Sequence, residues 1–233
     1  MRRTAPSDAV NKLIQENPAS GYFCFTEDRM HDIRMTDAIP LRWVERPAAL
    51  RTTFTGECLP GEFYTWQVGL FAPYEVLSDV SVSFSDWKNE KGNKIPASAF
   101  RCFNLGGIDT NGKPFKKKID VPKGNVQALW IGGDMPVTAS GTYKGTVTVK
   151  AANAKPVEIA CELTVKGEPA VNHGDDEGWR KTRLRWLDSS IGNADEPTYP
   201  YIPVKQQKQA VSGLGGTMEL SKNGLPQSIA TRY

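Results

Sequence analysis

The residue types best suited to chemistry are concentrated in one 21-residue stretch, EGWRKTRLRWLDSSIGNADEP, which starts at Glu177. It contains two tryptophans, four basic side chains and four carboxylates, including the adjacent pair Asp195 and Glu196. A second pair, Asp176 and Glu177, overlaps its start. Most glycoside hydrolases use a pair of carboxylates to hydrolyse the glycosidic bond. The stretch therefore raises three possibilities: an active site, a nucleic-acid contact or a structural element.

The acidic pairs favour surface loops over catalysis. Adjacent residues on a strand point to opposite faces, so neighbours in sequence do not form a site by themselves. Both pairs also lie in segments with glycine, asparagine or proline, which are typical of exposed turns. We interpret them as solvated charges or as ion pairs with nearby arginines. Asp188, Asp195 and Glu196 lack the ligand spacing of a calcium loop. No catalytic residue is predicted.

The remaining reactive residues form no recognisable site. Cys24, Cys58, Cys102 and Cys161 are far apart, and the two histidines are isolated, so neither a zinc site nor a cofactor is expected. Buried thiols are the ordinary expectation, and the sequence leaves disulfide pairing open. There is no GxSxG motif for a hydrolase nucleophile. The run GLGGT is followed by strand-like alternation, which favours a turn over a phosphate loop.

The composition argues against nucleic acid or a membrane as a partner. The formal net charge is only +3, too small for a dedicated nucleic-acid binder. The run Lys116–Lys118 fits a solvated edge strand. No apolar run approaches the roughly 20 residues of a membrane span. The N-terminus has two arginines and no apolar segment after them, so no signal peptide is predicted. A cytoplasmic protein, or a chain that starts downstream of its natural beginning, would both fit.

The elements that must position these residues are strands. Apolar residues alternate with polar ones through GTYKGTVTVK and again through VEIACELTV, and the polar loop AANAKP joins the two runs. This pattern predicts a β-hairpin with one solvated face. Alternation also predicts strands over Tyr64–Leu70 and Val80–Phe84, and NVQALWIGG predicts a strand buried on both faces. The same alternation predicts a strand over Leu50–Phe54, and weaker strands are expected over Phe100–Asn104 and Lys117–Val121.

About eight short strands with no helices between them predict an all-β protein, an antiparallel Ig-like β-sandwich followed by the start of a second β domain. The expected divisions are a lead-in over 1–40, the sandwich over 41–168, a linker over 169–178 and a truncated second domain over 179–233. In the lead-in, SDAVNKLIQE predicts a short helix capped by Ser7 or Asp8, and residues 21–47 are expected to be irregular.

The aromatic and basic residues of the opening stretch indicate a domain junction. Tryptophans at this density are costly to expose, and arginines can lay their stems or guanidinium planes against indole rings. Alternation over Arg183–Asp188 predicts a strand. If the Trp186 indole is buried, Trp186→Ala should lower the free energy of unfolding by about 3 kcal/mol or more. We expect the interdomain contact to involve Trp179, Arg183, Arg185, Trp186 and Asp188.

The string WRKTRLRWLDSSIGNADEPTYPYIPVK, followed by MELSKNGLPQSI, resembles the junction in bacterial glycoside hydrolase family 123. There an N-terminal β-sandwich leads into a second β domain, with a (β/α)8 catalytic barrel further on. The preceding WIGGDMPVTASGTYKGTVTVKA is similar to runs in that sandwich and in many Ig-like modules. The resemblance covers roughly residues 40–233.

This resemblance implies a parent enzyme of the β-N-acetylgalactosaminidase type. Its Asp–Glu pair and the substrate's own acetamido group would act in the barrel, which this chain lacks. No catalytic role therefore transfers to the acidic pairs of this chain. The implied partner is the downstream catalytic domain of the same polypeptide, and the implied location is extracellular or periplasmic.

Two alternatives remain open: a stand-alone carbohydrate-binding module whose partner is a glycan, and an adhesin-like interaction domain. A sugar binder needs two or three aromatic rings exposed on a shared surface. The sequence offers seven for that purpose: Trp43, Tyr64, Trp66, Trp87, Trp130, Tyr199 and Tyr201.

Overall fold

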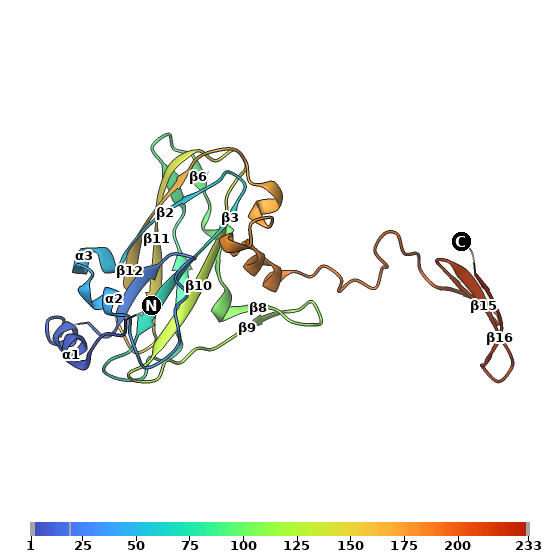
Figure 1. The fold of residues 1–233 in the computed structure, drawn as a ribbon, viewed down its shortest axis with the longest axis horizontal. Helices are drawn as coiled ribbons and strands as arrows, with labels where there is room; N and C mark the ends of the chain where they lie inside the picture. Colours follow the sequence, from blue (N-terminus) through green and yellow to red (C-terminus); the bar gives the residue numbers. More distant parts are fainter. Residues whose placement is uncertain (1–2, 19, 232–233) are drawn as a thin grey trace. The chain divides into compact units, whose positions relative to one another are not determined.

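The computed structural model describes residues 3–18 and 20–231, and it confirms the predicted all-β class. The chain divides into two compact units (Figure 1). The first comprises Met1–Ile108 and Pro114–Asp188, and the second comprises Asp109–Lys113 and Ser189–Tyr233. The first unit thus includes the whole predicted linker and ends ten residues after it.

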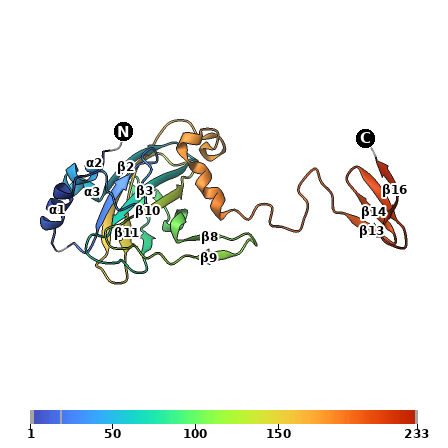
Figure 2. The ribbon, with the colours of Figure 1, turned by 60° about the horizontal axis from the view of Figure 1, so that its bottom comes forward.

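The first unit is a sandwich of two sheets (Figures 1 and 2). The first sheet has the antiparallel order β1 (Phe23–Glu27), β3 (Phe63–Phe71), β10 (Val126–Asp134) and β7 (Phe100–Cys102). The second sheet has the order β2 (Thr53–Cys58), β12 (Val157–Val165), β11 (Gly141–Lys150), β5 (Trp87–Asn89) and β6 (Lys94–Ile95), and β4 (Ser81–Phe84) also pairs with β11. Only β2 and β12 are parallel among these pairs. A small separate pair joins β8 (Gly106–Ile108) and β9 (Pro114–Lys116).

The core between the sheets follows the predicted alternation. Tyr64, Trp66, Val68 and Leu70 point inward from β3 and are buried. Rings pack around Trp66, whose centroid lies 5.4 Å from that of Phe54 and 5.7 Å from that of Trp87. The predicted hairpin is β11–β12, with apolar residues such as Val147 and Ile159 paired on the core face. The strand predicted to be buried on both faces is β10.

The outer face of the first sheet is also covered, in keeping with the strand predicted to be buried on both faces, although the elements that cover it were not predicted. At one end of this face, Phe23, Phe25 and Phe71 form a second apolar cluster with Trp43 and Leu13. Helices α1 (Ser7–Gln15) and α2 (Leu41–Glu45) supply Leu13 and Trp43, and the short α3 (Ala48–Arg51) follows. At the other end, the side chains of Glu27, Thr65 and Gln67 are buried although they are polar. This polar half positions the candidate site.

Several local predictions were wrong. Helix α1 begins after Pro6, and neither Ser7 nor Asp8 caps it with a side chain. The supposedly irregular 21–47 contains β1 and α2. Residues up to Arg51 of the expected Leu50–Phe54 strand are helical, and Lys117–Val121 forms only a bridge from Val121 to Leu77. Arg183–Asp188 is not a strand but part of a 3₁₀ helix, Thr182–Asp188.

The second unit contains a four-stranded antiparallel meander, and Figure 2 shows its strands β13, β14 and β16 together. Its strands are β13 (Lys205–Gln207), β14 (Ala210–Gly213), β15 (Gly216–Leu220) and β16 (Pro226–Thr231). The predicted turn at Asn223–Gly224 joins the last two strands, and Gly224 has the positive φ that such a turn needs. Over 189–231 none of its residues is buried. This sheet has no core of its own within the described residues.

Candidate functional site

Residues 175–188, here called the junction segment, contain all five residues expected at the domain junction. The segment folds as two 3₁₀ turns, Gly178–Arg180 and Thr182–Asp188. Lys181 between them has a φ of 55°, so the chain changes direction there and neither strand nor long helix continues. The second turn packs against β3, β8 and β10. The segment therefore belongs to the sandwich, on the polar half of the outer face.

A buried carboxylate anchors this segment. Glu62, which immediately precedes β3, is 0% exposed. It accepts hydrogen bonds from the guanidinium of Arg29, from the Arg180 guanidinium at 2.9 Å and from the Leu59 backbone N–H at 2.9 Å. Arg29 follows β1 and is 5% exposed. One carboxylate thus joins the ends of two strands to the junction segment through two cations.

The backbone of the junction segment is bound at the same place. The carbonyl oxygen of Arg180 accepts hydrogen bonds from Arg29 Nη1 at 3.2 Å and from Thr65 Oγ1 at 3.0 Å. Because both donors are buried, these contacts exchange little with water and fix the turn against β3. The buried Thr65 hydroxyl is therefore satisfied by the segment that covers it, whereas Gln67 bonds to the loop after β1 and Glu27 to Trp43, Arg42 and Arg46.

Aromatic rings complete the packing around Arg29. Its guanidinium carbon lies 4.6 Å from the Tyr64 ring centroid and 4.9 Å from that of Trp179. The Arg180 guanidinium lies 4.5 Å from the same Trp179 centroid. Such cation–π contacts contribute about 0.5–2 kcal/mol each, the larger values applying when they are desolvated. Trp179 is therefore held in place by two cations that share one carboxylate.

Glu177 supports Trp179 and Arg180 from the solvent side. Hydrogen bonds from the Arg180 guanidinium and from the Trp179 indole N–H, the latter at 3.2 Å, hold the pKa of the Glu177 carboxyl below its ordinary value of 4.5. A carboxyl whose pKa is lower in the folded state stabilises that state above its ordinary pKa, and loses this contribution as the pH falls through the folded value.

We therefore expect the Trp179 indole signal in a ¹H–¹⁵N spectrum to be constant from pH 7 to about 5 and to move at lower pH, below the ordinary carboxyl range. In Glu177→Gln the acid step of the Trp179 signal should disappear. The signals of the core tryptophans should be the same as in the unsubstituted chain. An acid step that survives in Glu177→Gln would assign it to another group.

Further ion pairs fasten the rest of the junction segment. Asp175 accepts from the Arg185 guanidinium and, at 2.7 Å, from Thr182 Oγ1. Lys181 pairs with Asp32, and its ammonium lies 5.0 Å from the Trp130 ring centroid. At the end of the segment Asp188 meets Arg101 of β7.

The ion pair between Asp188 and Arg101 is packed against aromatic rings. Arg101 Nε lies 2.8 Å from Asp188 Oδ2, and the Arg101 guanidinium rests over the rings of Phe63 and Phe103 at 4.9 and 5.4 Å from their centroids. A side chain at Gly107 would approach Asp188, with a Cβ 3.2 Å from Oδ1. The absence of a side chain at Gly107 thus leaves room for the carboxylate beside β8.

The five expected junction residues therefore have different roles within the first unit. Trp179, Arg185 and Asp188 contact the sandwich or brace its junction segment, as described above. Arg183 is exposed, donates to the Asp175 carbonyl at 2.9 Å and lies over the Trp186 ring. Trp186 is 52% exposed, and Leu187 beside it is exposed as well. Their part in an interdomain contact stays a prediction.

The predicted loss of about 3 kcal/mol for Trp186→Ala required a buried indole, and Trp186 is half exposed. We expect Trp186→Ala to lower the free energy of unfolding of the isolated chain by less than about 1 kcal/mol, as is usual for surface positions. Urea unfolding followed by tryptophan fluorescence measures this. A loss of about 3 kcal/mol would mean that the indole is buried in solution.

The essential members of the network that sequence reasoning missed are Arg29, Glu62 and Arg101. Glu62 carried a signal, because it is a lone charge directly before a run of nine residues that are all buried, Phe63–Phe71. Such a charge is retained in a core only when it is paired. Its partners lie 33 and 118 residues away in the chain, so the sequence did not identify them.

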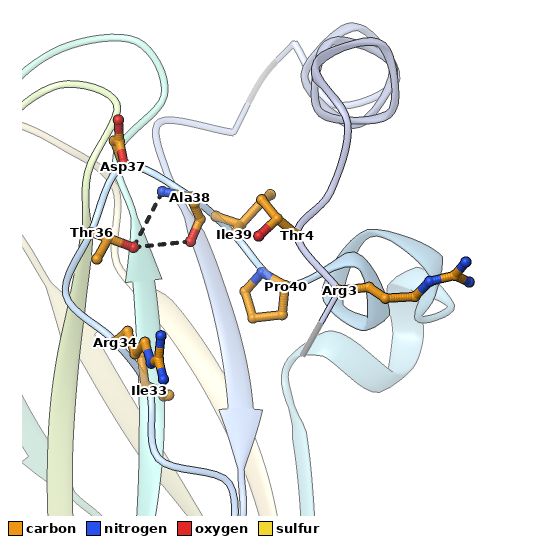
Figure 3. A pocket seen from close by; sticks show the side chains of 9 residues that line it. All are labelled: Arg3, Thr4, Ile33, Arg34, Thr36, Asp37, Ala38, Ile39 and Pro40. Carbon is orange, nitrogen blue, oxygen red and sulfur yellow. Dashed lines mark hydrogen bonds between the residues drawn. The ribbon is translucent and has the colours of Figure 1, made fainter. Parts of the chain in front are cut away.

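A separate hollow of about 270 Å³ lies between the N-terminal lead-in and the loop before α2. Figure 3 shows Thr36 bonded to both backbone polar groups of Ala38, while the guanidinium groups of Arg3 and Arg34 point in different directions. Its other lining residues are Thr4, Ile33, Asp37, Ile39 and Pro40. With no convergent polar groups this hollow indicates no particular chemistry.

The reactive side chains do not converge elsewhere. No cluster of three or more metal-ligating side chains occurs over residues 3–18 and 20–231. The four cysteines are unpaired thiols, and burial raises the pKa of Cys58, Cys102 and Cys161 to about 12, so they are poor nucleophiles at neutral pH. In that same part of the chain, no helix is long and apolar enough to cross a membrane.

The aromatic rings considered for sugar binding are divided between core and surface. Trp43, Tyr64, Trp66 and Trp87 are buried, and Trp130 is half-buried under Lys181. Tyr199 and Tyr201 are exposed in the second unit. In the first unit the half-exposed tryptophans are instead Trp179 and Trp186.

The first unit is thus a β-sandwich with a turn-rich segment bound to its outer sheet face. No protein-family model and no curated protein matches the chain. Among solved structures it is similar to a family 123 glycoside hydrolase from Clostridium perfringens, studied for glycolipid glycan hydrolysis, at 16% identity and a TM-score of 0.49. That match covers 64% of this chain and 28% of the hydrolase, so the chain spans less than a third of its length.

Two further similar structures are smaller β proteins. One is self-complemented MyfA, the major subunit of Myf fimbriae from Yersinia enterocolitica, at 14% identity, a TM-score of 0.33, and coverage of 48% of this chain and 92% of that one. The other is a PapD-like domain of human CEP192, at 16% identity, a TM-score of 0.32, and coverage of 49% and 81%. Similarities of this degree concern the β-sandwich fold alone.

Proposed function

We propose that the chain is a non-catalytic β-sandwich region of a larger glycan-degrading hydrolase of the family 123 type, in which it supports the catalytic barrel. The observation that carries this proposal is the junction segment. It is fixed to the sandwich by buried ion pairs, yet it leaves Trp186 and Leu187 exposed. Exposed apolar side chains on a rigid support are suited to receive another domain.

Two further features favour a supporting role. Three of the four carboxylates of the junction segment, Asp175, Glu177 and Asp188, are paired with arginines. These three are held in ion pairs and are not the free acid and base that glycoside hydrolysis needs. The string that resembles the family junction, which starts at Trp179, begins in this same segment. The proposed setting is an exported bacterial enzyme of the β-N-acetylgalactosaminidase type.

The proposal is tested by comparing this chain with a longer product of the same gene. The chain alone should not release p-nitrophenol from p-nitrophenyl β-N-acetylgalactosaminide, whereas the longer product should. Replacing Trp186 and Leu187 together by aspartate in the longer product should separate one unfolding transition into two in calorimetry. The matched control places the same two changes in the isolated chain, where they should matter little. Hydrolysis by the chain alone, or unchanged coupling in the double variant, would contradict the proposal.

A further inference from the structure

A groove of about 380 Å³ opens on the first unit beside the buried ion network. Its volume lies within the range of about 300–1,000 Å³ that small-molecule sites occupy. Residues from the ends of β1 and β2, from the start of β3 and from the turn Gly178–Arg180 line it. The residues that matter for recognition are Asp28, Met30, Glu57, Lys166 and Trp179. This groove is independent of Trp186 and Leu187, which carry the proposed domain contact.

Trp179 provides the groove with a fixed aromatic surface. Arg29 and Arg180 both contact its ring, and both bind the single Glu62 carboxylate. The ring is nevertheless 46% exposed, so about half of its surface remains open to solvent. A tryptophan held in one orientation loses little conformational freedom when a ligand stacks on it. The ion network thus pre-organises an open indole surface.

The rim of the groove offers both hydrogen-bond donors and acceptors. Lys166 Nζ lies 2.8 Å from Glu57 Oε1, and both side chains are exposed, so each retains free bonding capacity. Asp28 is held in position by the His31 ring, 2.8 Å away, and by the backbone N–H of Met30 at 2.7 Å. A ligand that satisfies this rim needs groups that donate as well as accept, which hydroxyl groups do.

The charges around the groove favour an uncharged ligand. Three cationic side chains contribute to it, those of Arg29, Lys166 and Arg180. They are matched by the carboxylates of Asp28, Glu57 and the buried Glu62, and both arginines are already bound to Glu62. No uncompensated cation remains to attract a phosphate or a carboxylate.

From these three features we infer that the groove binds a neutral saccharide. The apolar face of a pyranose ring packs on the exposed part of the Trp179 ring, and its hydroxyl groups bond to Glu57, Lys166 and Asp28. Met30, which is exposed, adds apolar contact at the mouth. A planar indole beside paired charges suits a ring that has apolar C–H faces and a polar hydroxyl periphery.

The test uses ¹H–¹⁵N spectra of the chain, in which the Trp179 indole signal is identified by its absence from Trp179→Phe. Lactose, cellobiose and N,N′-diacetylchitobiose are titrated to about 20 mM, since a single stacked ring gives millimolar affinity. Glucuronate and inorganic phosphate are the anionic probes, and a tripeptide of serine and glycine is the peptide probe. We expect a saturable shift of the Trp179 signal with at least one disaccharide.

Variants separate stacking from accidental contact. Trp179→Ala should weaken the disaccharide affinity about tenfold or more, read from the Lys166 backbone amide, because the stacking surface is lost. Trp186→Ala is the matched control, a half-exposed tryptophan of the same segment outside the groove, and should change the affinity less than about twofold. Glu57→Gln with Lys166→Met, two exposed positions that cannot unfold the core, should also weaken binding.

Three outcomes would overturn the inference. They are the absence of any shift with all three disaccharides, affinity unchanged in both Trp179→Ala and the rim variant, and a stronger response to glucuronate, phosphate or the peptide than to every disaccharide. None of these measurements involves a catalytic domain, so failure here leaves the proposed supporting role untouched. Loss of domain coupling likewise leaves the saccharide result intact.

Discussion

Replacing Glu62 by alanine should lower the free energy of unfolding of the chain by about 3–5 kcal/mol, because removal of one partner leaves buried charges uncompensated. Glu62 is fully buried and is the carboxylate shared by Arg29 and Arg180. Without it, Arg29 remains between the Tyr64 and Trp179 rings with no counter-charge at its Nη1. Urea unfolding followed by tryptophan fluorescence gives the size of the effect.

Glu177→Gln is the matched control for this substitution. Glu177 also pairs with Arg180, but it does so from the solvent side and its side chain is 45% exposed. Its replacement should leave the urea midpoint unchanged within error, because exposed pairs contribute little. If Glu62→Ala and Glu177→Gln shifted the midpoint equally, the buried carboxylate would not be the anchor of the junction segment.

The network also raises the question of why charges occupy this place at all. A buried ion pair replaced by apolar residues of similar volume is often neutral or stabilising. We therefore expect the combined replacement Glu62→Leu, Arg29→Met and Arg180→Met to restore most of the stability that Glu62→Ala loses. It should not restore the orientation of Trp179, whose indole signal then becomes broad or shifts, because two cations no longer hold the ring. Unaltered Trp179 signals in the triple variant would assign its orientation to packing alone.

Alternation or a continuous apolar run predicted the long strands, including β3 and β10, whereas the short strand β1, which is covered on both faces, was missed. Strands β11 and β12 show apolar and polar residues in turn because only one of their faces meets the core. Strand β1 has five buried residues in a row, with Phe23 and Phe25 under the helices and Cys24 toward the core. Its period of two was therefore hidden, and its short length gave no other signal.

The candidate site was predictable only in part, because local sequence shows which residues are present but not which distant residues they pair with. The aromatic and basic density of the junction segment was visible, because it lies in consecutive residues. The strand predicted over Arg183–Asp188 was wrong because six residues fit a period of two and a helical period almost equally well. The conformation is decided by partners such as Asp175 and Arg101, which bind Arg185 and Asp188. Such pairings are set by the fold and not by local sequence.

The helices on the outer face depend on a single missing side chain, at Gly69. This residue lies on β3 opposite Phe25 and Ala128, and the Trp43 ring of α2 covers it. A Cβ at this position would lie 2.2 Å from Trp43 Cη2 and 2.8 Å from Cζ2. The ring cannot easily move aside, because it is fully buried and stacks on Phe25 with the centroids 4.6 Å apart.

We therefore expect Gly69→Ala to cost about 3 kcal/mol of unfolding free energy, at the upper end of the usual range for overpacking. Displacing the indole would also weaken its N–H hydrogen bond to Glu27, a buried carboxylate that Arg42 and Arg46 share. Urea unfolding measures the loss, and hydrogen exchange of the α2 amides should rise with it. Gly178→Ala is the control, since that glycine has ordinary φ and no atom within 4 Å of an added Cβ.

A double-mutant cycle with Trp43→Phe tests the cause. Phenylalanine lacks the far ring atoms that an alanine at position 69 would meet, so the added cost of Gly69→Ala should fall below about 1 kcal/mol in that background. Trp43→Phe alone should still be destabilising, because it leaves a gap above Gly69 and removes the donor to Glu27. Costs that simply add in the double variant would mean that the alanine acts on the strand itself, and the close approach of Trp43 to Gly69 would not be what holds α2 on the sheet.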